Sequence, residues 1–443
     1  MRHLAKILLL VLAFCATGTA LWAQQRFPPP EFESGYKMPG TIIPAARAAL
    51  LPYVDIVVLA GCLGVSLWLV YKKRSRRGVF WLSLFSLAYF GFYRKGCVCP
   101  IGSPQNVIYG LVHPEYAVPL TVVAFFALPL FTALVAGRAF CAGVCPQGAL
   151  QDFMLVKPLR VPLWLEHGLS TLPFIFLGAG LAFAATGTGF IICRYDPFVP
   201  IFRLSGSFFI LTLGGGFLLA GMFIGRPYCR FLCPYGAMLK SAALVSRWRV
   251  RVTPTVCTQC RLCEKSCPFG ALRTPSEHSQ APVTQTERSR LGRLLALLPV
   301  LIAVGALLGA LTSPAAARLH QDVSLADLYL RQKQTPVTYG PGTPEALALA
   351  RVEQKPDVIL QAAAVLRHQF KLATTLFGGW VGLVLGCKLI ALSVRSSQTD
   401  YEPDRGACFA CARCFSHCPS ELTRRSLAAG ATATPTAVAE EGP

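Results

Sequence analysis

Apolar residues in this chain are gathered into long blocks, which short polar loops separate. Seven blocks come close to the ~20 residues that a helix needs to cross the ~30 Å hydrocarbon layer of a membrane. They lie near residues 49–71, 78–93, 117–136, 168–192, 206–224, 292–315 and 373–394. The second block is short and could end at the membrane surface. The pattern predicts an all-α polytopic membrane protein with about six to seven transmembrane helices.

The segments outside these blocks differ in composition. Residues 1–23 carry basic, then apolar, then small residues, as in a secretory signal peptide; an uncleaved N-terminal helix is the alternative. Residues 24–48 are proline-rich and predict an exterior segment without regular helix. Residues 316–372 are of mixed charge and predict a second exterior segment, large enough for a small helical cap. Residues 427–443 are of low complexity and predict a disordered tail.

The distribution of charge orients the chain. There are 42 Lys and Arg against 21 Asp and Glu, for a formal net charge of +21, yet only 14% of residues are charged. The basic residues stand mostly at the ends of apolar blocks and are densest over Lys72–Arg77, after the first block. This is the positive-inside pattern of a multi-spanning protein and not a nucleic-acid footprint. It predicts that the loops after the first, third and fifth blocks, and the C-terminal end, are cytoplasmic.

Eight of the 18 cysteines lie in two runs of one spacing, C-x2-C-x2-C-x3-C-P. The runs occupy residues 253–285 and 400–426, with the cysteines Cys257, Cys260, Cys263 and Cys267 in the first and Cys408, Cys411, Cys414 and Cys418 in the second. Bacterial ferredoxins have this spacing because three close thiolates wrap three corners of one [4Fe–4S] cube. Structural zinc sites usually pair two C-x2-C knuckles across a longer gap. The runs therefore predict two [4Fe–4S] clusters in cytoplasmic ferredoxin-type modules.

Two apolar segments, residues 286–315 and 373–395, separate the runs along the chain, yet the predicted orientation puts both runs on the cytoplasmic side. In a two-cluster ferredoxin the fourth cysteine of each run binds the other cube. We therefore predict a split ferredoxin, in which Cys418 completes the cube of the first run and Cys267 completes the cube of the second. The alternative is that each run closes its own cube.

A second cysteine pattern recurs where apolar blocks end. Within the membrane domain of residues 49–252, the element Gly-Arg-x-x-Cys-x3-Cys-Pro-x-Gly-Ala occurs twice and supplies Cys141, Cys145, Cys229 and Cys233. On the predicted topology these four thiols face the cytoplasm together, and four thiols can hold one metal centre. We expect Arg138 and Arg226 to lower the pKa of the thiols and to offset the charge of a cluster. The alternative is a set of reduced structural cysteines.

Three further cysteines end blocks on the predicted exterior side: Cys97, Cys99 and Cys193. We predict a metal site of three thiolates completed by another ligand, although an exterior compartment also permits a disulfide. Most of the ~30 Å apolar layer is expected to separate these cysteines from the inner four. An electron crossing that gap would need an intermediate, for example a haem or a quinone. No C-x2-C-H run for covalent haem is present in the sequence.

On its C-x3-C-P pairs and its eight ferredoxin cysteines, the chain resembles the NosR/NapH-type membrane polyferredoxins. The similarity covers residues 94–272 and the C-terminal run. It implies a multi-pass protein of the inner (cytoplasmic) membrane that supplies electrons to exported reductases. Nothing in the sequence matches the exterior FMN-binding domain, with its flavinylated Thr, that full NosR-type proteins carry. NapH-type proteins also keep their two ferredoxin runs adjacent, whereas a pair of apolar segments separates them here.

These features predict an electron-transfer component of an oxidoreductase system rather than a stand-alone enzyme. A cytoplasmic donor or a membrane quinol would supply electrons, and an exterior flavin-binding protein or reductase would accept them. The alternative is a copper-reducing assembly factor for a respiratory oxidase, because the membrane ferredoxins that assist oxidase assembly share the Gly-Arg-x-x-Cys-x3-Cys-Pro element. A redox sensor is a third possibility. The sequence has no phosphate loop, nucleotide fingerprint or Ser/His/Asp constellation, so we expect partners to carry out the substrate chemistry.

Overall fold

The computed structural model describes residues 50–96, 100–253, 257–275, 285–335, 356–394 and 400–430, with scattered positions between 337 and 352. The predicted signal peptide, the proline-rich segment, Cys97, Cys99 and the tail from residue 431 lie outside the described residues. The described part is mostly helical, as the apolar pattern predicted.

Each of the seven apolar blocks contains helix. In chain order the helices are α2 (Leu51–Leu67) continuing as η1 (Trp68–Lys72), α3 (Arg76–Ser86) continuing as η2 (Leu87–Tyr93), α5 (Leu120–Ala136), α8 (Leu163–Leu169) with α9 (Leu172–Ala185), α12 (Phe208–Gly221), α16 (Gln285–Ala317) and α19 (Pro356–Ser393). Among the described residues, four segments are long and apolar enough to cross a membrane: Leu51–Lys72, Leu163–Ala185, Arg288–Ala317 and Pro356–Ser393. Helices α5 and α12 are apolar but shorter. The predicted number of spans stays a prediction.

Short helices fill the loops that carry the cysteines. They are α4 (Ser103–Val112), α6 (Ala139–Gly143), α7 (Pro146–Phe153), α10 (Ile191–Arg194), α11 (Val199–Arg203), α13 (Pro227–Phe231) and α14 (Pro234–Leu244). Proline begins α7, α13 and α14, where its fixed φ suits the first helical position and its missing N–H leaves no hydrogen bond unmade. The α6–α7 pair packs against the first two helices, because Ser66 Oγ donates to the Ala139 carbonyl at 3.0 Å and Ser86 Oγ donates to that of Val144. These loops are therefore part of the helical core.

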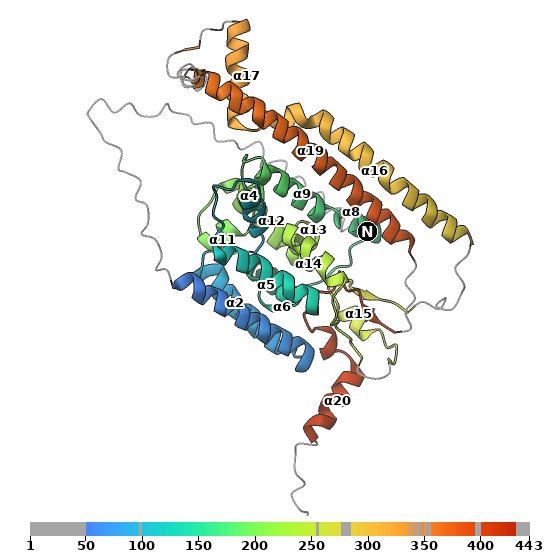
Figure 1. Ribbon diagram of the computed structural model, residues 1–443. Coiled ribbons are helices and arrows are strands. Elements are labelled where there is room, and N and C mark those ends of the chain that lie inside the picture. Colours follow the sequence, from blue (N-terminus) through green and yellow to red (C-terminus); the bar gives the residue numbers. More distant parts are fainter. Residues whose placement is uncertain are drawn as a thin grey trace, which may run out of the picture.

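Helices α16 and α19 form a close antiparallel pair along one side of the molecule (Figure 1). A methyl group on Gly309 would overlap the carbonyl oxygen of Thr374, and one on Gly382 would overlap that of Leu301. Only glycine allows two backbones to approach so closely. The pair is attached to the other helices through α9, because Trp380 Nε1 donates to the carbonyl oxygen of Phe174 at 2.8 Å.

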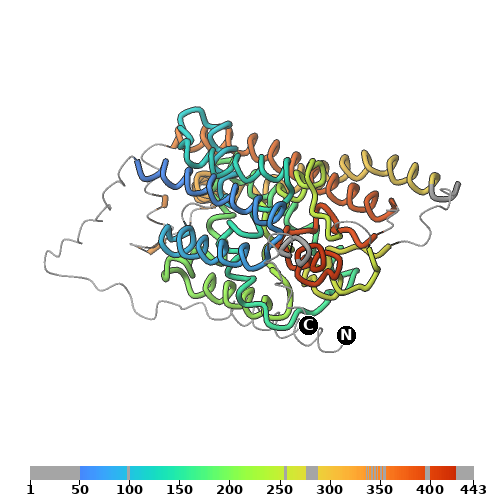
Figure 2. Tube along the Cα trace, turned by 90° about the horizontal axis from the view of Figure 1, so that it is seen from below, coloured from blue at the N-terminus to red at the C-terminus, as the bar shows by residue number. Residues whose placement is uncertain are grey.

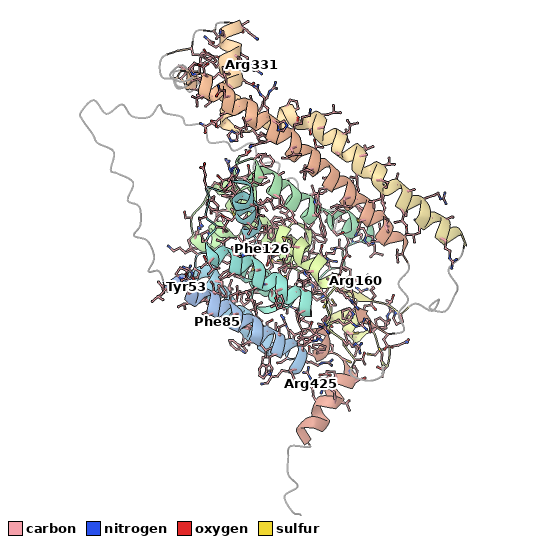
Figure 3. The ribbon with its side chains drawn as sticks, in the orientation of Figure 1. Tyr53, Phe85, Phe126, Arg160, Arg331 and Arg425 are labelled. Carbon is pink, nitrogen blue, oxygen red and sulfur yellow. The ribbon has the colours of Figure 1, made fainter. Side chains whose placement is uncertain are left out.

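The segment predicted as exterior contains helix. Helix α17 (Gln321–Gln334) follows α16, and α19 begins at Pro356, well before the predicted span at residue 373. Arg367 on α19 pairs with Asp327 on α17 at 2.6 Å. Figure 3 shows Arg331 of α17 at one end of the molecule and Arg425 at the other, with exposed apolar side chains such as Tyr53 and Phe85 between them.

The two ferredoxin runs meet at the end where α2 finishes. Their elements are α15 (Leu262–Ser266) and β1 (Leu272–Arg273) in the first run, and β2 (Glu402–Pro403), η3 (Cys414–Ser416) and α20 (Pro419–Gly430) in the second. The strands pair antiparallel, with Leu272 opposite Pro403. Arg74, in the basic loop after α2, pairs with Glu421 at 2.7 Å. Figures 1 and 2 show the C-terminal run beside the first run and below α2. That this end is cytoplasmic stays a prediction.

Candidate metal centres

The eight ferredoxin cysteines line two cavities. Cys257, Cys260 and Cys263 of the first run share one cavity with Cys418 of the second. Cys408, Cys411 and Cys414 of the second run share the other with Cys267 of the first. Each cavity thus combines three cysteines of one run with the fourth of the other. This is the arrangement that the split-ferredoxin hypothesis requires, and the assignment of the ligands stays a prediction.

The backbone of both runs has the same shape. Gln259 and Arg261 in the first run, and Ala410 and Ala412 in the second, have positive φ between 52° and 61°. These residues stand two and four places after the first cysteine of their run. When right- and left-handed residues alternate, successive backbone N–H groups point into the same concavity. Many proteins bind Fe–S clusters with the N–H groups of such a concavity. Ala410 N–H, for example, donates to Cys408 Sγ at 3.4 Å. The residues present therefore fit an anionic iron–sulfur cluster.

Contacts outside the cavities hold the two runs together. The Asp404 N–H donates to the carbonyl oxygen of Ala271 at 2.7 Å, next to the paired strands, and Asp404 also pairs with Arg273. Glu421, fully buried at the start of α20, pairs with Arg74 at 2.7 Å, Arg424 at 2.8 Å and Arg425 at 3.0 Å. These three arginines lower the pKa of Glu421 to about 2, although burial acts in the opposite direction.

The four inner cysteines are all buried in the main hydrophobic core. Arg226, three residues before Cys229, donates to the carbonyl oxygen of Cys141 and so links the two motifs. Gln151 Nε2 donates to Cys229 Sγ at 3.2 Å, and the Gly236 N–H donates to Cys233 Sγ at 3.2 Å. The structure brings the C-x3-C-P pairs together as predicted from the repeated motif. Their role as metal ligands stays a prediction.

The expected effect of the arginines on these thiols is outweighed by burial. Burial raises the pKa of Cys229 to about 11, although Arg226 and Arg138 act to lower it. The side chains of Cys229 and Arg226 are both in the core. There the loss of hydration destabilises a thiolate by more than the attraction of Arg226 stabilises it. A buried thiol of this kind loses its proton when a metal binds, because the metal ligand is the thiolate. Within the described residues, no three His, Cys, Asp or Glu side chains converge on the site of a single metal ion.

Two arginines and two phenylalanines fill the space between the inner cysteines and the second ferredoxin cavity. The guanidinium of Arg138 lies 4.0 Å from the ring centre of Phe409. That of Arg226 lies 5.6 Å from Phe409 and 5.8 Å from Phe269. The two rings are 4.8 Å apart, and each follows a cysteine of the second cavity by one or two residues. The inner cysteines and this cavity are therefore neighbours within one packed core.

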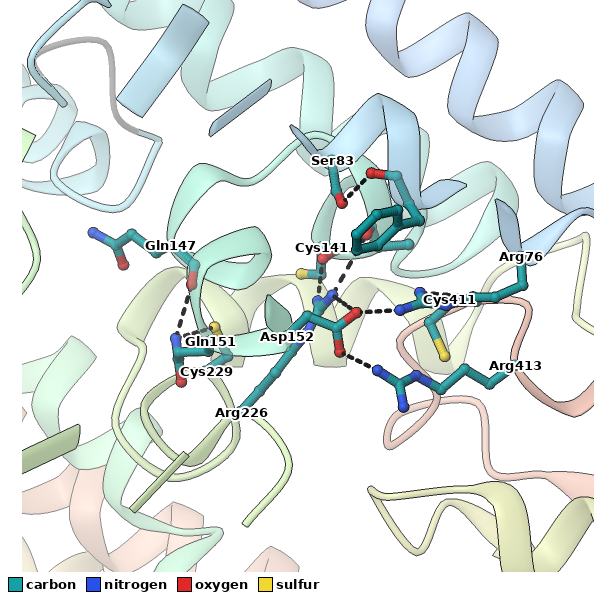
Figure 4. A network of polar contacts seen from close by, with 12 residues as sticks. Arg76, Ser83, Cys141, Gln147, Gln151, Asp152, Arg226, Cys229, Cys411 and Arg413 are labelled. Carbon is teal, nitrogen blue, oxygen red and sulfur yellow. Dashed lines mark hydrogen bonds and ion pairs between the residues drawn. The ribbon is translucent and has the colours of Figure 1, made fainter. Parts of the chain in front are cut away.

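Asp152 forms ion pairs with three arginines from three parts of the chain (Figure 4). Its carboxylate pairs with Arg76 at 2.6 Å, with Arg413 at 3.1 Å and with Arg226 at 3.6 Å. Burial alone would raise the pKa of Asp152, but the arginines hold it well below its usual range. Arg413 belongs to the second ferredoxin run and Arg226 to an inner cysteine motif. Asp152 thus fixes the ferredoxin end to the membrane helices.

On the predicted exterior side, the structure describes one of the three cysteines. Cys193 lines an open cavity together with the ion pair between Asp55 and Arg94, whose atoms are 2.7 Å apart. The Cys193 N–H donates to Gln105 Oε1 at 3.3 Å. Cys97 and Cys99 lie outside the described residues, so the predicted three-thiolate site stays a prediction.

Sequence reasoning missed the polar residues that support the cysteines, above all Gln151, Asp152 and Gln105. A signal for the two glutamines was present. The element Cys-Pro-x-Gly-x-x-Gln begins at Cys99 and again at Cys145, and it ends at Gln105 and Gln151. In both places the glutamine Oε1 accepts a backbone N–H from a cysteine segment, that of Cys193 or that of Tyr228.

Comparison with known proteins agrees with these sites. One 4Fe–4S binding domain model matches residues 118–162 and 207–253, and another matches residues 250–273. The chain is 28% identical over 209 residues to the regulatory protein NosR of Pseudomonas aeruginosa, a match that covers 42% of this chain and 28% of that one. It is 31% identical over 156 residues to the methylamine utilization ferredoxin-type protein MauN of Paracoccus denitrificans, which covers 33% of this chain and 54% of MauN. These matches support the resemblance to the NosR/NapH-type membrane polyferredoxins.

A third relative is the putative electron transport protein YccM of Escherichia coli. The two are 27% identical over 191 residues, which is 38% of this chain and 52% of YccM. The chain thus spans about half the length of YccM and MauN and less of NosR. No solved structure gives a significant match. The domain matches and these relatives support an iron–sulfur protein that is associated with a membrane.

Proposed function

We propose that this protein carries electrons across the membrane, between its ferredoxin end and an acceptor on the opposite face. The contact between the second ferredoxin cavity and the inner cysteines is the observation that carries the proposal. Phe409 follows Cys408 directly, and its ring packs against the guanidinium of Arg138, three residues before Cys141. An electron leaving that cavity therefore meets the inner cysteines as the next sulfur site in the core.

Each ferredoxin cavity would hold one [4Fe–4S] cluster, which accepts and gives up one electron at a time. The first would use Cys257, Cys260, Cys263 and Cys418 as ligands, and the second Cys408, Cys411, Cys414 and Cys267. The supporting observation is that the cavities combine cysteines of both runs in these sets. Left-handed residues at matching places in both runs support the same assignment.

The inner cysteines Cys141, Cys145, Cys229 and Cys233 would hold a further iron–sulfur centre. The 4Fe–4S domain match over residues 118–162 and 207–253 includes both C-x3-C-P pairs, which supports this reading. Arg138 and Arg226 would offset the negative charge of such a centre, and the hydrogen bonds to Cys229 and Cys233 would stabilise its thiolates. Cys193, with Cys97 and Cys99, would form the metal site on the exterior side, from which the acceptor takes the electrons.

The partners follow from this direction of transfer. A cytoplasmic electron donor or a membrane quinol would reduce the ferredoxin end. An exterior flavin-binding protein or reductase would take the electrons, because the sequence shows no flavin-binding domain of the kind that full NosR-type proteins carry. The membrane would be the inner (cytoplasmic) membrane, with the ferredoxin modules in the cytoplasm.

Two measurements test the proposal. Anaerobically purified protein should contain at least about eight iron atoms per chain, the load of two four-iron cubes, and give [4Fe–4S] EPR signals on reduction. In sealed vesicles with the ferredoxin end inside, dithionite trapped in the lumen should reduce a flavoprotein outside. Ser at Cys141 should stop the transfer and leave the ferredoxin signals, whereas Ser at the exposed Cys387 should change neither.

The vesicle experiment also has outcomes that count against a relay. Reduction of added copper without reduction of the flavoprotein would favour the assembly-factor alternative. Reporter fusions at Lys72, Ser276 and Ser426 should behave as cytoplasmic and one near Gly340 as exterior. If the two ferredoxin runs report opposite sides, the split ferredoxin is wrong.

A further inference from the structure

Basic side chains from three helices lie around one corner of the molecule, where α19, α8 and α14 come together. On α19, Lys388 Nζ donates to Ser170 Oγ at 2.8 Å and lies 3.4 Å from His167 Nδ1, both at the end of α8. Figure 1 shows α8 beside the lower part of α19. Lys240, on α14, extends to the same corner, because its Nζ lies 5.9 Å from the ring centre of Phe174, one turn after Ser170.

This corner adjoins the second ferredoxin run. A methyl group on Gly406 would lie 3.1 Å from Lys240 Cγ, so the run packs directly on the stem of the lysine. On α19, Lys388 stands five residues before the helix ends at Ser393, which is ~8 Å along a helix that rises ~1.5 Å per residue. On the predicted topology the corner therefore lies on the cytoplasmic side, where the hydrocarbon layer meets the headgroups.

Positive charge exceeds negative charge at this corner. Glu166, the acidic residue of α8, already pairs with Arg230 at 2.5 Å. Within the part of the chain that the structure describes, no carboxylate forms an ion pair with Lys240 or Lys388. The Ser170 hydroxyl that accepts from Lys388 carries no charge. A half-buried ammonium is costly without an anion beside it, so the two lysines favour an anionic ligand.

The pKa of Lys240 reflects the same excess of positive charge. Burial, together with the charges of Lys388 and Arg138, lowers this pKa to about 8, although nearby carboxylates act in the opposite direction. The surroundings of Lys240 thus destabilise its charged form. An anion placed between Lys240 and Lys388 would stabilise both ammonium groups.

Exposed apolar side chains surround the corner. Leu385 and Leu392 lie three and four residues from Lys388, on the same face of α19, and both are exposed. Leu163 and Trp164, at the start of α8, are exposed as well. In a membrane such leucines face acyl chains, and tryptophan is enriched at the level of the headgroups. The corner therefore combines positive charge with a surface that suits acyl chains.

We propose that this corner binds an anionic phospholipid, with its phosphate between Lys240 and Lys388 and its acyl chains along α19. Basic pockets between membrane helices on the cytoplasmic side bind such headgroups in other proteins. Free phosphate has the same charge, but it would leave the exposed leucines uncovered. The bound lipid attaches α19 to α14, and through Lys240 to the second ferredoxin run. This inference does not depend on the path or direction of electron transfer.

Native mass spectrometry of the full chain, purified in detergent and loaded with lipid, tests the site. We expect one dioleoylphosphatidylglycerol to stay bound per chain under conditions that remove dioleoylphosphatidylcholine, which has the same acyl chains and no net charge. Equal retention of the two lipids would overturn the inference, because the binding would then be hydrophobic only. Phosphatidylglycerol should also raise the unfolding temperature. If inorganic phosphate raises it equally, the site takes free phosphate and the assignment to a lipid is wrong.

Lys240→Met and Lys388→Met each remove one ammonium group and keep the length of the side chain. Each should weaken the binding of phosphatidylglycerol about fivefold, since a lysine beside an anionic headgroup is worth about that factor. Lys388→Arg should retain the binding. The control Lys371→Met, at an exposed position earlier on α19, should leave it unchanged. Unchanged binding in Lys388→Met, or an equal loss in the control, would overturn the site. If a variant does not fold, the comparison of the two lipids on the unaltered chain decides.

Discussion

Asp152→Asn should weaken the attachment of the ferredoxin end to the membrane helices. The substitution keeps the shape of the side chain and removes one charge. It leaves Arg76, Arg413 and Arg226 facing an amide, at positions where their atoms now lie 2.6, 3.1 and 3.6 Å from the carboxylate. Arg226 is fully buried, whereas Arg76 and Arg413 reach water with 20% and 25% of their side chains.

The magnitude follows from the burial of these partners. Removing one partner of a buried ion pair costs ~3–5 kcal/mol, because the remaining charge stays buried and unpaired. Two of the three arginines can turn partly to water, so we expect a loss of about 3 kcal/mol. The temperature at which detergent-solubilised protein loses its cluster absorbance should fall by about 3 °C.

Asp327→Asn is the matched control, because Asp327 also pairs with two arginines, Arg318 and Arg367, at 3.1 and 2.6 Å. Those arginines are 59% and 44% exposed, so the loss should be below about 1 kcal/mol. A carboxyl with a lowered pKa stabilises the folded chain above its ordinary pKa and loses that contribution in acid. The loss of stability that Asp152→Asn causes should therefore be constant between about pH 6 and 8. Equal losses in both variants would refute the reasoning.

Three further results are expected. Gly309→Leu should separate α16 from α19, cost about 1–3 kcal/mol and reduce the yield of both ferredoxin EPR signals, whereas Gly292→Leu, which meets no neighbour, should not. Cys267→Ser should change the cluster signal that depends on Cys408 and spare the one that depends on Cys257; the reverse result would mean that each run closes its own cube. Glu421→Gln should speed proteolysis of the C-terminal run above about pH 4.5, and the difference should shrink as the pH falls toward 2, since Glu421 has its pKa lowered to about 2.

The helices and the ferredoxin runs could be predicted because their signals are local. An apolar block of sufficient length gives a helix, and the spacing from Cys257 to Pro268 sets the shape of one cluster loop. That the distant runs lie together could also be expected, because the fourth cysteine of a ferredoxin run serves the other cube. The exchange of ligands between the runs stays a prediction. The cavity shared by Cys418 and the first run agrees with that logic.

The depth of the cysteine loops could not be predicted in the same way. Hydropathy treats the residues around Cys145 and Cys229 as loops between spans, and loops are expected at the membrane surface. The structure instead packs them into the core, where small residues such as Gly148 leave room for the carbonyl oxygen of Cys141 and the guanidinium of Arg226. Gln147 and Gln151 look like ordinary helix residues in the sequence, and their partners Asp196 and Cys229 are far away along the chain.

The helical pair α16–α19 lies between the two ferredoxin runs, and this position governs the order of biogenesis. On the proposed ligand sets, the first run has only three of its four cysteines until Cys418 has left the ribosome. By then both helices of the pair have been synthesised, and on the predicted topology the second of them has returned across the bilayer. A chain in which the pair inserts upside down or stops halfway would keep its C-terminal cysteines on the wrong side, and both cubes would stay open. On the proposed ligand sets and topology, cluster insertion would serve as a checkpoint on the orientation of the last two helices.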